Sequence, residues 1–198
     1  ARKDRMNGDA WSDAVLAAVC FFLVIRYGRV LPGLAIAVGL IGLAATFGIL
    51  RFSGWDTFLG PHRFTSLFAA CTAFPLLALV LRWPQAPSAV RTTAAVRFAL
   101  IVGGIGVALS ISGISLWSLL LPGASAILIT WTMIQRRNSL GLAGAAALLA
   151  GFAAAAAGKA ADGYLGVFNH TQFLHYCLAV ALFCLAHAAQ HLMSQQRK

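Results

Sequence analysis

Residues 92–135 read TTAAVRFALIVGGIGVALSISGISLWSLLLPGASAILITWTMIQ, and this stretch decides how many helices the chain forms. A helix needs about 20 apolar residues to cross a membrane, so the stretch is long enough for two crossings. Residues 98–131 are almost continuously apolar, and the only signs of a break are Gly113 and the serines Ser110, Ser112 and Ser115. We interpret the stretch as two helices, over about 92–111 and 114–135, joined by a tight turn at Ser112 and Gly113.

The rest of the chain has the same apolar character. Of its 198 residues, 60% are apolar and 10% are charged, and the mean hydropathy is +0.82, whereas a soluble domain contains about 25% charged residues. Division at glycines, prolines and charged clusters predicts further helices over about 11–27, 31–51, 64–83, 139–158 and 170–193. Short connections favour antiparallel neighbours. The sequence therefore predicts an all-α, polytopic integral membrane protein, with residues 1–198 forming one seven-transmembrane-helix bundle. Six helices is the alternative.

The strongly basic balance reflects topology and membrane lipids rather than nucleic acid. The chain has 15 Lys and Arg, five Asp and no Glu. Its cations stand singly or in pairs between apolar runs, as topology signals and contacts with anionic lipids do. Nucleic-acid binding is disfavoured, because no long basic face with interleaved aromatic residues is present to follow a phosphate backbone.

The positive-inside rule predicts the orientation, because cytoplasmic loops carry an excess of Lys and Arg. One face holds nine cations: Arg26, Arg29, Arg82, Arg91, Arg97, Arg136, Arg137, Arg197 and Lys198. The opposite face holds three to six: Arg51, Arg63 and Lys159, with Arg2, Lys3 and Arg5 if these are native. We therefore expect a multi-pass protein of the cell membrane with its N-terminus outside and its C-terminus inside. Richness in Ala, Gly and Arg favours the inner membrane of a bacterium.

Glycines predict close packing of the sixth segment. Gly144, Gly151 and Gly158 recur every seven residues in an alanine-rich run. A stripe of small residues lets a neighbouring helix approach closely. We expect this helix to be central and tightly packed. Such stripes are also compatible with assembly into a homo-oligomer.

Polar side chains gather at the predicted outer ends of the helices. Histidines and a carboxylate are the ligand set of a hydrolytic zinc site, in which zinc activates a bound water. The candidate ligands are His62, His170 and His175, with Asp56 or Asp13 as base or orienting partner. The competing interpretation is that these residues cap helices and contact lipid headgroups; Asn169 and Gln172 have the spacing of a capping box. His170 and His175 lie about 140° apart around a regular helix, so they do not face the same point.

A second cluster lies at the other end of the last segment. Cys184, His187 and His191 have spacings of three and four, which place them on one helix face. The interpretation we favour is that they are polar residues reaching the membrane surface. The alternative is haem ligation through His187 or His191, as in an electron-transfer subunit.

Three short stretches carry a family resemblance: ILRFSG at 49–54, PHRF at 61–64 and FNHTQFLH at 168–175. Together with seven helices, an outer N-terminus and a histidine pair that opens the last helix, the chain resembles the CREST superfamily of alkaline ceramidases and of progestin and adipoQ receptors. Within it, the chain is most similar to an uncharacterised bacterial branch.

The resemblance implies a zinc ion that hydrolyses an amide in a lipid. His62, His170 and His175 would bind the zinc, with Ser53 and Asp56 as polar partners near the reaction centre. The last-helix histidines of the family are usually four positions apart, whereas His170 and His175 are five apart. The family's Ser-x-x-x-His motif on the second helix is absent, since Ser53 precedes His62 by nine positions.

The first hypothesis for function is therefore a membrane-embedded, zinc-dependent hydrolase acting on a lipid or lipid-like amide or ester. Its nucleophile would be the zinc-bound water. The alternative is a non-catalytic membrane protein that binds a lipid or small ligand, or that serves as an assembly subunit. A haem-binding electron-transfer subunit is a third hypothesis.

Overall fold

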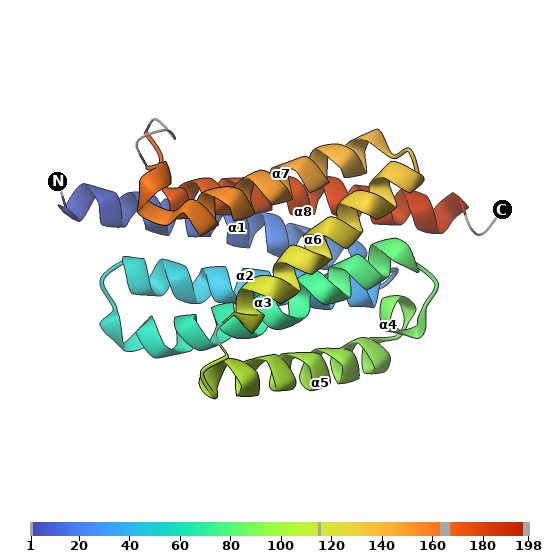
Figure 1. Cartoon of the computed structure of the whole chain (residues 1–198), viewed down its shortest axis with the longest axis horizontal. Helices are drawn as coiled ribbons and strands as arrows, with labels where there is room; N and C mark the ends of the chain where they lie inside the picture. Colours follow the sequence, from blue (N-terminus) through green and yellow to red (C-terminus); the bar gives the residue numbers. More distant parts are fainter. Residues whose placement is uncertain (1, 115, 163–166, 196–198) are drawn as a thin grey trace.

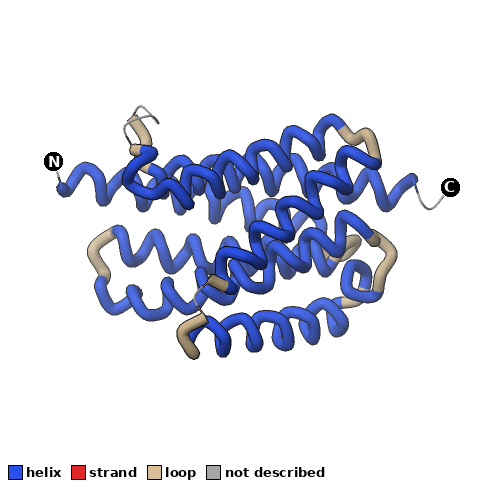
Figure 2. Tube along the Cα trace, viewed as in Figure 1, coloured by secondary structure: helices blue, strands red, loops and turns tan. Residues whose placement is uncertain are grey.

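The computed structural model describes residues 2–114, 116–162 and 167–195, with side chains from residue 8 onward. Ser115, Arg197 and Lys198 lie outside the described residues, as do the side chains of Arg2, Lys3 and Arg5. Every regular element in the described part of the chain is helical (Figures 1 and 2). Most of the long helices lie along the length of the bundle, α6 crosses them obliquely, and the two termini lie at opposite ends of the bundle (Figure 1). We call these ends the N-terminal end and the C-terminal end of the bundle.

The helices in chain order are as follows. Those long enough to cross a membrane are α1 (Arg2–Tyr27), α2 (Pro32–Phe52), α3 (Leu59–Arg82), α5 (Thr92–Ile111), α6 (Trp117–Gln135), α7 (Ser139–Ala157) and α8 (His170–Gln195). Shorter elements are η1 (Asp56–Phe58), α4 (Pro87–Val90) and η2 (Gly158–Ala161). Seven helices of the described chain are thus long and apolar enough to span a membrane, which confirms the seven-helix bundle over the six-helix alternative.

Local sequence signals explain where several helices begin and end. Pro32 occupies the first turn of α2, where a proline costs no hydrogen bond. Asn138 caps α7, because its side-chain oxygen accepts from the Gly141 backbone N–H at 2.7 Å. The break between α5 and α6 is the predicted one, and Gly113 adopts a φ of 93° there, a conformation that glycine permits. The helix boundaries differ from the sequence prediction mainly at two starts. α1 begins at Arg2 and not at about residue 11, and α3 begins at Leu59 and so includes His62.

The prediction for the glycine stripe is only partly confirmed. Gly144 and Gly151 lie against α8: a Cβ at either position would come within 2.9 Å of a cysteine Cβ on that helix. Gly158 instead ends α7 with a φ of 57° and is not part of a packed face. The expected central position of this helix is wrong. Among the long helices, α7 packs mainly against α8 and α6, whereas α3 packs against α2, α5, α6 and α8.

The core lies where α1, α2, α3 and α8 meet. Its largest fully buried side chains include Leu23, Leu34, Leu77 and Leu185. α5 lies at one edge of the bundle (Figure 1). The first and last helices of the chain are neighbours, and this adjacency brings together polar groups that are far apart in sequence.

Candidate functional site

An apolar cavity of about 670 Å³ lies among six of the seven long helices, all except α5. Its wall consists mostly of Ala, Leu, Ile and Phe side chains. The polar or titratable residues that line it are Asp13, His62, Ser66, Ser118 and His175. Apolar pockets with a few convergent polar groups are the usual form of ligand sites.

The cavity also reaches the outer surface of the bundle beside α6 and α7. Leu119 and Ile127 both line the cavity, yet they are 66% and 67% exposed. Leu149 on α7 lines it as well and is 40% exposed. These residues belong to helices that are long and apolar enough to span a membrane, so in a bilayer this side of the cavity would face lipid chains.

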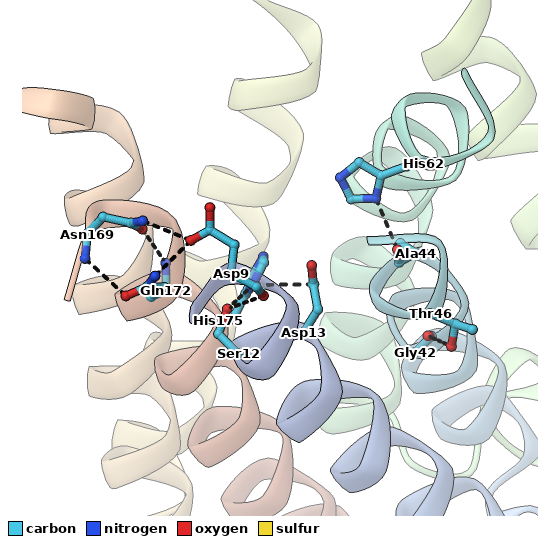
Figure 3. A network of polar contacts seen from close by, with 10 residues as sticks. All are labelled: Asp9, Ser12, Asp13, Gly42, Ala44, Thr46, His62, Asn169, Gln172 and His175. Carbon is cyan, nitrogen blue, oxygen red and sulfur yellow. Dashed lines mark hydrogen bonds and ion pairs between the residues drawn. The ribbon is translucent and has the colours of Figure 1, made fainter. Parts of the chain in front are cut away.

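The polar end of the cavity is built by α1 and α8 (Figure 3). His175 Nδ1 lies 3.0 Å from Ser12 Oγ and 3.3 Å from Asp13 Oδ1. Ser12 and Asp13 are 0% and 1% exposed. A polar group this deeply buried is costly unless it has a partner, so the three side chains depend on one another.

The hydrogen bonds determine which nitrogen of His175 carries the proton. Ser12 Oγ donates its only proton to the Asp9 backbone oxygen at 2.9 Å. It can then only accept from His175, so His175 Nδ1 is the donor. In the neutral ring this leaves the lone pair on Nε2.

His62 faces the same cavity from α3 and has the same tautomer. Its Nδ1 lies 3.2 Å from the Ala44 backbone oxygen on α2. A carbonyl oxygen only accepts, so Nδ1 carries the proton and Nε2 holds the lone pair. In Figure 3, His62 lies across from Asp13 and His175, with its other ring nitrogen directed away from Ala44.

Asp13 has one oxygen that is not used. Oδ1 faces His175, whereas Oδ2 is buried and has no hydrogen-bond partner among the described residues. On its other side the carboxyl group touches α2: a Cβ at Gly48 would lie 2.6 Å from Asp13 Cγ. Gly48 is therefore the residue that lets α2 pass this close to the carboxylate.

A second polar contact ties α1 to the start of α8. Asp9 Oδ1 accepts from Asn169 Nδ2 at 2.8 Å and from Gln172 Nε2 at 2.9 Å. Asn169 and Gln172 also cap the helix: Asn169 Oδ1 accepts from the Gln172 backbone N–H at 2.8 Å, and Gln172 Oε1 accepts from the Asn169 backbone N–H at 3.4 Å. The capping box expected from their spacing is confirmed.

The other predicted site residues lie away from the cavity wall. His170 is held at the start of α8 by Asp162, whose Oδ1 lies 2.8 Å from His170 Nδ1 and accepts from its backbone N–H at 2.7 Å. Ser53 ends α2 and Asp56 begins η1, and both are exposed. The structure thus places His62, His175 and Asp13 on the wall of one cavity, with His62 across from the other two, and it does not bring His170, Ser53 or Asp56 to that wall. Within residues 2–114, 116–162 and 167–195, no three His, Cys, Asp or Glu side chains are grouped closely enough to hold a metal ion.

Sequence reasoning missed Asp9, Ser12, Ser66 and Ser118 as residues of this region. A signal was present on α1, because Asp9, Ser12 and Asp13 have spacings of three and four and so share one helix face. Gln172 and His175 have the matching spacing on α8. Ser66 and Ser118 gave no such signal.

The His187 cluster at the C-terminal end differs from this site. His187 Nδ1 bonds to the Phe183 backbone oxygen of its own helix at 2.8 Å, and its ring meets Tyr27 edge-on at 5.8 Å between centroids. These contacts hold the ring within the packing of α1 and α8. Haem binding through His187 or His191 stays a prediction.

The chain matches no protein-family model, and comparisons with curated proteins and with solved structures gave no match. The CREST resemblance therefore stays a prediction.

Proposed function

We propose that this chain is an integral-membrane hydrolase that takes a lipid-like amide or ester into the cavity between its helices. The observation that carries the proposal is the polar end of the cavity. There, two histidines with Nε2 lone pairs and a buried carboxylate with one unpartnered oxygen meet an otherwise apolar space. An acyl chain suits the apolar wall, and the bond to be cleaved would lie among the polar groups.

The donor chemistry of these groups suits zinc. Imidazole nitrogens are common protein ligands of catalytic zinc, and both histidines have an Nε2 lone pair at the cavity. Metal-binding histidines usually donate their other N–H to a carboxylate or a carbonyl. His62 donates to the Ala44 carbonyl, and His175 Nδ1 faces Asp13 Oδ1 at 3.3 Å beside its bond to Ser12. His62 and His175 would hold the ion through their Nε2 atoms, whereas His170 would not. The Asp13 carboxylate faces Nδ1 of His175 and would orient that ring. When bound, zinc would supply an activated water for hydrolysis.

Zinc binding also requires a movement in the protein. Since no metal-binding group is formed by the described side chains, His62 would have to approach Asp13 and His175 across the cavity. Its side chain has room to move, because it faces open space and is only half-buried.

Each protein group has a further role in this proposal. Asp13 and Ser12 orient the His175 ring, and Ala44 orients His62. Ser66 and Ser118 offer hydroxyl groups to a polar headgroup. The opening beside Leu119 and Ile127 admits the substrate from the membrane. With the N-terminus outside, the polar groups lie in the outer half of the membrane, which we take to be the inner membrane of a bacterium.

The test is elemental analysis of the full chain, purified in mild detergent without chelator or a metal-affinity step. We expect about one zinc per chain, lost in His62→Ala and in His175→Ala. His170→Ala is the matched control, because it removes a histidine of the same helix that does not line the cavity, and it should keep the zinc. Hydrolysis of lipid amides and esters should follow the zinc content across these variants. Zinc that survives both cavity substitutions, or that is lost equally in His170→Ala, contradicts the proposed site.

A non-catalytic lipid-binding protein is the second candidate. Two observations favour it: the wall of the cavity is mostly apolar, and the described His, Cys and Asp side chains form no group that could hold a metal ion. In that case native mass spectrometry of the purified protein will find a bound lipid and no metal. Hydrolysis of lipid amides and esters will then be absent, in the wild type as well as in the His62→Ala variant.

A further inference from the structure

A second cavity, of about 590 Å³, lies at the C-terminal end of the bundle, where α3 and α6 end. Its lining residues are Arg82, Trp83, Gln85, Ala86, Gln135 and Arg136. In contrast to the mostly apolar lining of the first cavity, four of these six residues are arginines or glutamines. The hydrolase proposed above does not use it.

Two helix ends that are distant in sequence build this second cavity. α3 ends at Arg82 and α6 ends at Gln135, and Arg82 Nη1 donates a hydrogen bond to Gln135 Oε1. The Arg82 guanidinium also lies 5.9 Å from the centre of the Trp83 ring. Arg82 is thus held in place between the two helices, while Arg136 on the opposite rim is exposed.

No carboxylate of the described side chains lies near this basic cavity. The aspartates whose side chains the structure describes all belong to the N-terminal end of the bundle: Asp9, Asp13, Asp56 and Asp162. Cations at helix C-termini are favoured by the helix dipole. The helix dipole explains why arginines lie at these helix ends. It does not explain the cavity that they line together with two glutamines and a tryptophan.

We propose that this cavity binds the phosphate group of an anionic lipid headgroup from the adjacent leaflet. Guanidinium groups bind phosphate oxygens through paired, charge-assisted hydrogen bonds. Gln85 and Gln135 add side-chain amides, and Trp83 is suited to the membrane interface. Basic pockets between transmembrane helices are known sites for such headgroups. The cavity is larger than a single phosphate group needs, which leaves room for the remainder of a headgroup.

The experiment measures binding of phospholipids to the full chain in mild detergent by native mass spectrometry, with the thermal midpoint as a second readout. The probes are short-chain phosphatidylglycerol, phosphatidylcholine with the same chains, and inorganic phosphate. We expect saturable binding of phosphatidylglycerol with a stabilising shift, and at least tenfold weaker binding of phosphatidylcholine. Equal binding of the two lipids overturns the proposal. Inorganic phosphate that displaces phosphatidylglycerol at equal concentration also overturns it, since the site would then take the free ion.

Three variants separate a defined site from general attraction to a basic protein. Arg136→Gln removes an exposed guanidinium of the cavity. Arg82→Gln removes the guanidinium that is hydrogen-bonded to Gln135. Arg29→Gln is the matched control, because Arg29 is exposed at the same end and carries the same charge but does not line the cavity. We expect about a tenfold loss of phosphatidylglycerol affinity in each cavity variant, the size expected for a hydrogen bond to a charged group, and less than a twofold loss in the control. Equal losses in all three overturn the proposal.

Discussion

Asp13 on α1 and His175 on α8 lie with Oδ1 and Nδ1 3.3 Å apart inside the bundle, although they belong to the first and the last helix of the chain. The pair exists because α1 and α8 are neighbours, and α2 lies close to the other side of the carboxyl group at Gly48. Its position at the wall of the cavity makes it the centre of the proposed reaction site.

Gly48→Ala will displace the Asp13 carboxyl group, since the added methyl would lie 2.6 Å from Asp13 Cγ. We expect the free energy of unfolding to fall by about 1–3 kcal/mol, as for other overpacked sites, and bound zinc to be lost. Gly39→Ala on the same helix is the control, because its methyl would meet only Val24 Cγ2 at 3.5 Å, an ordinary contact. Thermal unfolding in detergent and elemental analysis check both variants. If both variants retain the stability and zinc of the wild type, the close approach of α2 does not matter for the site.

Asp9→Ala will loosen the start of α8. Its carboxylate accepts from both Asn169 and Gln172, and partly buried donors that lose a charged partner cost about 1–3 kcal/mol. Hydrogen exchange should rise over residues 169–175, and the thermal midpoint should fall. Asp56→Ala removes the same charge from an exposed position and should change neither. An Asp9→Ala protein as stable as the Asp56→Ala protein would show that the link between α1 and α8 carries no stability.

Gly144→Ala will separate α7 from α8, because the new methyl would lie 2.9 Å from Cys184 Cβ and 3.1 Å from the Ala181 backbone oxygen. A backbone atom cannot move aside alone, so we expect a destabilisation of about 1–3 kcal/mol. Gly104→Ala on α5 serves for comparison, since nothing lies within 4 Å of its added Cβ. Reversible unfolding in mixed micelles measures the difference. Equal stability of the two variants would contradict close packing at Gly144.

Cysteine labelling will test the predicted orientation. In a background without Cys20, Cys71, Cys177 and Cys184, a cysteine replaces either Ser53 or Ser139, which are both exposed but lie at opposite ends of the bundle. A membrane-impermeant maleimide should modify Ser53→Cys in intact cells and Ser139→Cys only after permeabilisation, because the face rich in arginine stays in the cytoplasm. The reverse pattern would place the N-terminus inside and move the candidate reaction site to the inner half of the membrane.

Local features of the sequence were sufficient for the helices and several of their ends. An apolar run of about 20 residues has few alternatives to a transmembrane helix, because backbone groups in lipid must be hydrogen-bonded within the segment. The turn at Gly113 and the capping box of Asn169 and Gln172 are likewise short-range features, and the structure confirms both predictions. The cap at Asn138 is also short-range, although it was not predicted.

The composition of the candidate site depended on contacts between helices that are distant in sequence. The 140° between His170 and His175 showed that the two do not face the same point, but only the packing of α8 against α1 decided that His175 faces the cavity while His170 pairs with Asp162. Helix packing likewise placed Asp13, and not Asp56, at the cavity as the carboxylate beside the histidines. The reason is physical: a helix forms from contacts within a few residues, whereas its rotation about its own axis is set by the side chains of its neighbours.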